Sequence, residues 1–313
     1  MKILIAYDGS ESADKGIDDL SRAGLPVKVE ALVVSVAEVW LPPRPGDFDN
    51  TFPLQIPIGL QRAREHAAQI VREAQEFASN GSQRVRQTFP QWTVDHQMAV
   101  GSPAHEILNL AAEWKPNLIV VASHGRSALG RFVLGSVSQK VLTEAHTSVR
   151  VARQKTGTGN SAVRIVVGVD GSAGSQEAVR AVAARNWTPG SEVRVVIADD
   201  LLMANSVYRV IPPVNQFVNE VNESERTEAE RIAEETVKQL RLELDGKNVT
   251  VSSVVLTGNP KQQVVRHAEE FGADCIFTGA TGFSNRIERL LVGSVSAAIA
   301  ARAHCSVEVV RAG

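Results

Sequence analysis

The sequence is poor in several residue types, and each scarcity excludes a class of protein. Only two of its 313 residues are cysteine, Cys275 and Cys305, which excludes a small secreted domain held by disulfides. Each cysteine lies in or beside an apolar run, which favours buried thiols in a reducing compartment and leaves a disulfide between them as the alternative. The seven histidines show no metal-ligand spacing, so we expect no zinc site.

An excess of charge of one sign is also missing, as are long apolar runs. Lys and Arg total 33 against 35 for Asp and Glu, so the chain offers no basic field for nucleic acid. No apolar run is long enough to cross a bilayer, and the opening run, residues 1–8, is too short for a signal peptide and ends in an acid. We therefore expect a cytoplasmic protein with no nucleic-acid partner and no membrane partner.

The chain is long enough for two domains, and it repeats itself. Ile3–Ser10 (ILIAYDGS) returns as Ile165–Ser172 (IVVGVDGS), and Ser148–Val151 returns as Ser306–Val309. Between the copies, QKTGTGNSA has the polar, small composition of a flexible linker. The predicted parts are a first domain at 1–153, a linker at 154–162 and a second domain at 163–313.

Strand-like and helix-like segments alternate in each half, the pattern of a parallel sheet with crossover helices. Leu118–Ala122 is apolar throughout, as in a strand covered on both faces. The apolar spacing from Leu60 to Ser79 predicts a helix that ends at Gly81. The expected fold class is α/β, with a five-stranded parallel sheet and helices on both faces in each half. The predicted strands are 2–7, 27–36, 93–100, 117–122 and 148–152, then 164–169, 192–198, 248–256, 274–278 and 306–310.

A proline-rich segment, Ala37–Gly59, interrupts the first half, and its prolines argue against a regular helix there. Its counterpart in the second half is Asp199–Asn215. Long irregular insertions are often functional, so we interpret both as a lid or partner-binding surface, with a merely variable loop as the alternative.

In parallel sheets of this kind, ligands bind beyond the carboxyl ends of the strands, where the winding direction switches. Asp8-Gly9-Ser10 and Asp170-Gly171-Ser172 place an acid there, after the first strand of each half. Such an Asp can accept hydrogen bonds from a ribose or an adenine amino group. It can equally cap the following helix, and the two roles can coexist.

A second motif follows the fourth strand, where Ser123-His124-Gly125 leads to Gly135-Ser136 at a helix start. Free N–H groups and the positive end of the helix dipole suit a phosphate there. Ser136 and Ser138 are expected to add hydroxyl donors. The alternative is a simple turn with a serine cap. His124 could touch a phosphate or act as an acid or base, and packing is the other reading of that side chain.

These motifs together resemble the universal stress protein family. The resemblance rests on the strand-Asp-Gly-Ser opening, the Gly-x-x-Gly loop, a nine-residue gap before Gly-Ser and the short last strand, and it covers nearly the whole chain, twice. It implies Rossmann-like (adenine nucleotide alpha hydrolase-like) domains, in which the first-strand Asp contacts the adenosine and the loop and next helix hold the phosphates. In half one it implies Ala6, Asp8, Val36 against the adenine, Val121, Ala122, His124, Gly125, Gly135, Ser136, Val137 and Ser138. In half two it implies Gly168, Asp170, Ala198, Thr278, Gly279, Thr281, Gly282, Gly293, Ser294, Val295 and Ser296.

Each half departs from the family pattern. In half one Ala122 replaces the first glycine, and we expect its methyl group to crowd a phosphate. In half two ten residues, 283–292, separate Gly282 from Gly293, and the extra residue is expected to shift the phosphate donors. We therefore favour half one as the better site.

The resemblance implies an ATP-binding stress-response regulator without committed catalysis, in which AMP or ADP could replace ATP and Mg²⁺ could accompany it. No Walker loop or nucleophile elbow is present. The open alternatives are a scaffold that binds no nucleotide and works through unknown protein partners, and a weak ATPase. Because the family often pairs through its last strand, we expect an internal pseudo-dimer with 148–152 antiparallel to 306–310; a further homodimer is a second option.

Overall fold

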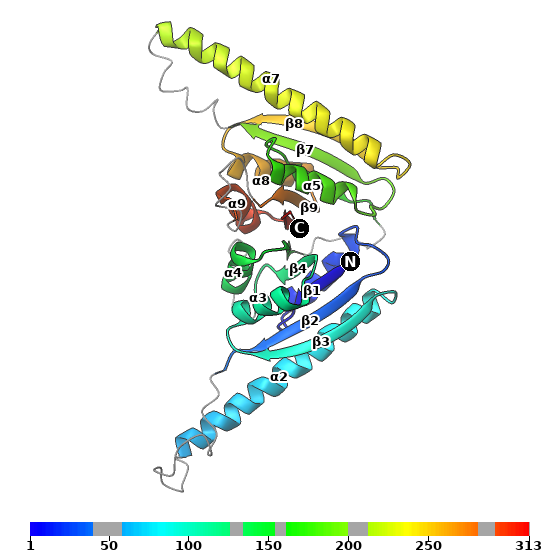
Figure 1. The fold of residues 1–313 in the computed structure, drawn as a ribbon, viewed down its shortest axis with the longest axis vertical. Helices are drawn as coiled ribbons and strands as arrows, with labels where there is room; N and C mark the ends of the chain where they lie inside the picture. The colour runs from blue at the N-terminus through cyan, green and yellow to red at the C-terminus, as the bar shows by residue number, and fades with distance from the viewer. Residues whose placement is uncertain (40–57, 126–133, 154–160, 200–211, 281–291, 313) are drawn as a thin grey trace.

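A computed structural model describes residues 1–39, 58–125, 134–153, 161–199, 212–280 and 292–312. The chain forms one ten-stranded sheet covered by helices on both faces, in the strand order β3-β2-β1-β4-β5-β10-β9-β6-β7-β8 (Figure 1). The predicted α/β class is confirmed. The expected helix-free segments lie mostly outside the described residues, although helices already begin at Ile58 and Pro212.

The ten strands fall where the sequence predicts them, within a few residues. Half one contains β1 (Lys2–Ala6), α1 (Glu11–Asp19), a 3-10 turn η1 (Leu20–Arg22), β2 (Glu30–Ala37), α2 (Ile58–Thr88), β3 (Thr93–Val100), α3 (Pro103–Trp114), β4 (Leu118–Ala122), α4 (Ser136–Glu144) and β5 (Ser148–Ala152). Half two contains β6 (Arg164–Gly168), α5 (Ala173–Ala183), β7 (Glu192–Asp199), α7 (Pro212–Glu243), β8 (Thr250–Thr257), α8 (Pro260–Phe271), β9 (Cys275–Gly279), α9 (Ser294–Arg302) and β10 (Ser306–Val310).

Within each half all neighbouring strands are parallel, and the winding direction switches beside the first strand. In half one β1 pairs with β2 on one side and with β4 on the other. In half two β6 pairs likewise with β7 and β9. Each half therefore has a crevice at the carboxyl ends of its first and fourth strands, the position at which such sheets bind ligands.

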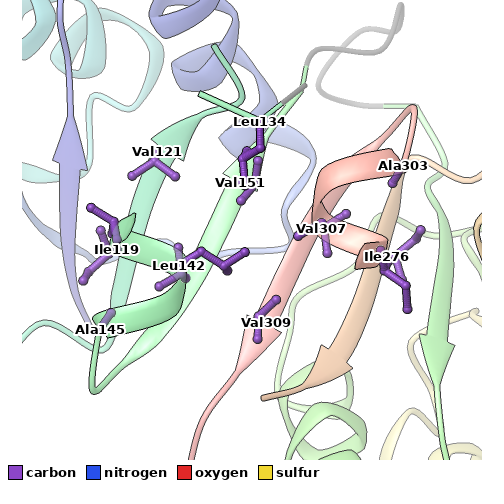
Figure 2. Packing of buried hydrophobic residues seen from close by; sticks show 14 of the residues in the cluster. Ile119, Val121, Leu134, Leu142, Ala145, Val151, Ile276, Ala303, Val307 and Val309 are labelled. Carbon is purple, nitrogen blue, oxygen red and sulfur yellow. The ribbon is translucent and has the colours of Figure 1, made fainter. Parts of the chain in front are cut away.

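The two halves join where β5 and β10 pair antiparallel, so the predicted internal pairing is confirmed. On one face of the sheet, Val149 and Val151 of β5 and Val307 and Val309 of β10 belong to a single apolar cluster with the helices α3, α4, α8 and α9. Figure 2 shows this cluster running from one half into the other. The opposite face has two separate apolar clusters, one under α1 and α2 and one under α5 and α7.

The last residues of the predicted linker are held by the first half. Arg22 donates to Ser161 and to the carbonyl of Ala162, and it forms an ion pair of 2.9 Å with Asp274. Residues 154–160 lie outside the described part of the chain. Both cysteines are buried and neither is in a disulfide. Among the described residues, no helix is both long and apolar enough to cross a membrane.

The prediction that Gly81 ends its helix is wrong, because α2 continues to Thr88. Gly81 is buried inside the helix, where α2 crosses the sheet. A Cβ built on Gly81 would lie 2.8 Å from Cδ1 of Tyr7 and 3.0 Å from Cγ1 of Val33. The glycine therefore allows the helix to lie close to the sheet, at the cost of the lower helix propensity of glycine.

We expect Gly81→Ala to lower the free energy of unfolding by about 1–3 kcal/mol, because overpacking against Tyr7 outweighs the better helix propensity of alanine. Urea unfolding followed by circular dichroism measures the change. Gly59→Ala, in the same helix with no atom within 4 Å of the new methyl, is the matched control and should be neutral or slightly stabilising. A Gly81→Ala protein as stable as the control would contradict the close contact.

Candidate functional site

A cavity of about 380 Å³ opens at the crevice of half one, between the ends of β1 and β4. This volume lies in the range of small-molecule sites. Every half-one residue implied by the family resemblance lines it, namely Ala6, Asp8, Val36, Val121, Ala122, His124, Gly125 and Gly135–Ser138. The structure thus brings together residues from four separate stretches of chain.

The start of α4 forms one wall of this cavity, and it is bare. Its N-cap is Gly135, and no side chain of the described residues caps it. By contrast, α1 begins with Ser10, whose hydroxyl accepts a hydrogen bond from the N–H of Ala13. The first N–H groups of a helix have no partner within the helix. At α4 no described side chain is bonded to them and the N-cap is Gly135, so the reading of Ser136 as a simple serine cap is wrong.

Two glycines keep the space in front of this helix open. A Cβ built on Gly135 would stand 3.5 Å from the carbonyl oxygen of Ser123 and 3.7 Å from the amide nitrogen of Gly125. A Cβ on Gly125 would lie 3.0 Å from Oδ2 of Asp8. Side chains at these positions would fill the cradle that the backbone amides and the Asp8 carboxylate share.

Asp8 does not cap the helix that follows it. Its Oδ1 accepts a hydrogen bond of 3.0 Å from the N–H of Ser10, and Ser10 is the cap of α1. The carboxylate therefore stabilises the turn with one oxygen while it lines the cavity. In half two, Oδ1 of Asp170 accepts in the same way from the N–H of Ser172, at 3.0 Å.

The two serines of α4 differ in what they can offer a ligand. Ser138 is buried, and its hydroxyl donates to the carbonyl oxygen of Ala122 at 2.6 Å. Its single hydrogen is used inside the protein, so the prediction that Ser138 supplies a hydroxyl donor is wrong. Ser296 repeats this bond to Gly279 in half two, also at 2.6 Å. Ser136 is exposed at the first turn.

His124 contributes a buried ring nitrogen without a partner in the described part of the chain. Its Nδ1 lies 2.9 Å from Oγ of Ser123, which fixes the ring. Its Nε2 is buried and makes no hydrogen bond with any described residue. Because an unpaired buried polar atom costs free energy, a ligand atom at this position would be stabilising.

The expected crowding by Ala122 is not found. The methyl group packs with the apolar cluster under α1, and a Cβ built on Gly16 of α1 would lie 4.0 Å from it. Val121 belongs to the cluster on the other face of the sheet. The side chain of Ala122 therefore points at α1, and its replacement of a glycine does not narrow the approach to α4.

No pattern in the sequence pointed to α2, which supplies Ile70, Glu73, Ala74 and Phe77 to the cavity wall. Phe77 covers the turn after Asp8. Gly9 there has a φ of +75°, and a Cβ on it would overlap the Phe77 ring. The positive φ explains a glycine in the Asp-Gly-Ser motif, but no pattern in the sequence shows which helix closes over it. The remaining residues missed are Tyr7, Val34, Ser35, Glu38, Pro103 and Ile107.

Tyr7 lines the cavity, but its hydroxyl is already hydrogen-bonded within the protein. Its hydroxyl donates to Oδ1 of Asp14 at 2.7 Å. Burial, together with this hydrogen bond to a carboxylate, raises the pKa of Tyr7 well above its usual value. The phenol is a fixed donor and no source of protons near neutral pH.

Half two has a similar cavity of about 300 Å³. Gly293 starts α9 with φ −60° and ψ 148°, against −60° and 149° for Gly135. The extra residue of half two therefore does not change the helix start. The implied residues Gly168, Asp170, Ala198, Thr278, Gly279 and Gly293–Ser296 all line the cavity, whereas Thr281 and Gly282 lie outside the described residues.

The carboxylates described at the half-one cavity give it negative charge. Asp8, Glu38 and Glu73 line it, and none of the described lining residues is Lys or Arg. Among the described residues, the N–H groups at the start of α4 and the dipole of this helix oppose the negative charge.

The fold defines a Rossmann-like α/β protein with a crevice beside a glycine helix start in each half. A family model described as the universal stress protein family matches residues 1–153 and 163–311. The chain belongs to this family.

Individual relatives match either the whole chain or one half of it. Universal stress protein Rv2005c of Mycobacterium tuberculosis is 26% identical over 315 residues, which cover 99% of this chain and 96% of that protein. A universal stress protein of Thermus aquaticus is 34% identical over 158 residues, 48% of this chain but 97% of that protein. A solved universal stress protein from Archaeoglobus fulgidus superposes with a TM-score of 0.60 at 18% sequence identity. The match covers 100% of this chain and 98% of the Archaeoglobus chain, and it supports the fold alone.

We expect Ser138→Ala to lower the free energy of unfolding by about 1–3 kcal/mol, because it removes a buried hydrogen bond between α4 and the end of β4. Ser136→Ala, two residues earlier and exposed, is the matched control and should change stability by less than about 0.5 kcal/mol. Denaturant unfolding of the two variants compares them. Equal stabilities would show that the Ser138 bond does not hold the helix.

Proposed function

We propose that this protein binds ATP in the half-one cavity and acts as a stress-response regulator through nucleotide occupancy. The observation that carries the proposal is the glycine start of α4, which no described side chain caps. It opens on the same cavity as Asp8 and Nε2 of His124, a nitrogen without a hydrogen-bond partner among the described residues. Backbone amides at a helix start bind phosphate, and a carboxylate binds hydroxyl or amino groups. A nucleotide carries both kinds of group, phosphates at one end and the hydroxyl and amino groups of ribose and base at the other.

The lining residues fit the parts of a nucleotide. Val36, Ile107 and Val121 offer an apolar surface to a base, while Asp8 would accept hydrogen bonds from the ribose or the base. The amides from Ser136 onward would bind the phosphates. AMP and ADP would make the same contacts to the base and to Asp8 as ATP. The contacts to the phosphates therefore determine which of the three nucleotides binds best.

Mg²⁺ would enter with the nucleotide. The three acidic residues of the cavity disfavour a bare triphosphate, whereas a phosphate-bound Mg²⁺ reduces the repulsion. We therefore propose Mg·ATP as the bound species, with half two as a second site of the same kind. We place this activity in the cytoplasm, because the two buried thiols suit a reducing compartment.

We propose binding without committed catalysis. Two of the groups that could move a proton are engaged with the protein: Tyr7 donates to Asp14, and Nδ1 of His124 lies against Ser123. Phosphate release measured with Mg·ATP tests this part of the proposal. Steady turnover that Asp8→Ala abolishes would establish the weak ATPase instead.

Asp8→Ala should weaken ATP and adenosine alike, by about 10- to 100-fold, because it removes hydrogen bonds to a charged group. Isothermal titration calorimetry on the full chain measures both ligands, and Asp170→Ala in the same protein separates the second site. Asp95→Ala, an exposed acid on β3, is the control. If wild-type protein binds no adenine nucleotide and gains no thermal stability from it, the proposal fails and the scaffold function is favoured.

Gly135→Ala should separate the phosphate contact from the adenosine contact. The backbone of Gly135 is one that alanine adopts readily, and among the described residues the added methyl meets no atom closer than 3.5 Å. The variant should fold normally and bind ATP at least about 10-fold more weakly, because the methyl fills the cradle over the Gly125 amide. Adenosine affinity should not change. Equal losses for ATP and adenosine would place the phosphates elsewhere.

A further inference from the structure

The junction between the halves has one pair of residues on its pseudo-two-fold axis. In the repeat, Arg150 of β5 and Glu308 of β10 occupy equivalent positions, within Ser148–Val151 and Ser306–Val309. In the sheet they are also directly opposite each other. A residue that pairs with its own equivalent lies on the axis that relates the two halves. At this position of the repeat the two halves carry opposite charges, arginine in the first and glutamate in the second.

The pair is fully buried and forms part of a neutral network of four ions. Arg150 and Glu308 are each 1% exposed. Arg150 Nη1 lies 3.3 Å from Oε2 of Glu308, and its Nε lies 2.7 Å from Oδ2 of Asp19 in α1. Arg185, beyond the end of α5, forms an ion pair with Oε1 of Glu308 and donates to the carbonyl of Ala23 at 3.2 Å.

Only one ion pair of this network crosses from one half to the other. Asp19 and Arg150 both belong to half one, and Arg185 and Glu308 both belong to half two, so each half is locally neutral. The contact between Arg150 and Glu308 is the ionic link across the axis. Substituting a like charge at either position would turn this buried attraction into a buried repulsion.

Two further polar contacts at the junction are the same in both directions, unlike the ion pair between Arg22 and Asp274 that also joins the halves. Arg153, after β5, donates to the carbonyl of Ala300 at 2.6 Å, near the end of α9. Its equivalent Arg311, after β10, donates to the carbonyl of Leu142 at 3.0 Å, near the end of α4. Two copies of either half could keep such contacts. Arg153 and Arg311 therefore stabilise the junction without distinguishing which half is the partner.

We infer that the charge at the axis makes this junction selective for unlike halves. Two first halves would bring Arg150 against Arg150, and two second halves would bring Glu308 against Glu308. The surface formed by β5 accepts an edge strand with an acid at its centre, and β10 satisfies this requirement. Another copy of the chain can use the junction only by exchanging halves, first half against second half.

The test uses two full-length variants with different affinity tags, Arg150→Glu and Glu308→Arg. Each alone has like charges at its axis, so we expect lower stability and a weakened internal junction. When the two are co-expressed and exchange halves, each junction between the chains again pairs one acid with one arginine. We expect the tags to copurify as a 1:1 heterodimer in native mass spectrometry, which co-expressed, differently tagged wild-type chains do not form.

A matched control uses the ion pair between Arg164 and Glu192, which also joins neighbouring strands but is half exposed. One chain carries Arg164→Glu and the other Glu192→Arg. We expect both variants to keep their stability and the two tags not to copurify. If the axis variants are as stable as wild type, or fail to copurify while folded, the proposal is overturned.

A second measurement covers the case in which the single variants do not fold. The double variant Arg150→Glu/Glu308→Arg restores opposite charges across the axis within one chain. We expect its loss of stability to be smaller than the sum of the two single losses, or the double variant to fold where the singles do not. A double variant whose loss of stability equals or exceeds the sum of the two single losses overturns the proposal.

Discussion

The antiparallel pairing of β5 with β10 is the interaction on which the rest of the structure depends. An unpaired edge strand leaves a row of amides and carbonyls open, and here each half covers the edge of the other. The pairing also closes one apolar cluster over both halves, so the cores under α4 and α9 are complete only when the halves are together (Figure 2). On the opposite face, where the apolar clusters stay separate, buried ions fill the junction.

The same junction reaches the helices that face the two cavities. No described side chain caps the start of α4 at the half-one cavity, and near the other end of this helix the carbonyl of Leu142 accepts a hydrogen bond from Arg311 of the other half. The helix α9 has the same arrangement with Arg153. A cation at the carboxyl end of a helix stabilises its dipole. Each helix whose start lines a cavity is therefore held in place by an arginine from the other half.

The strands, the crevices and the cradle glycines were predictable because each depends on local sequence. Apolar runs set the strands, and Gly135 precedes a helix start in the sequence as in the structure. What could not be predicted depends on neighbours distant in sequence. Gly81 has the composition of a helix stop, but its role comes from Tyr7 beneath it. Ser138 has the chemistry of a free donor, but the carbonyl of Ala122 takes its hydrogen.

The divergence of the two halves follows from where each residue lies relative to the axis. The helix starts at Gly135 and Gly293 lie away from the axis and have kept the same geometry. The axis position is different, because in a pair of identical halves a residue there must contact its own copy. A buried charge at that point would meet the same charge, so identical halves exclude it. Joining the halves in one chain removes this restriction, and Arg150 opposite Glu308 is an arrangement that only unlike halves allow.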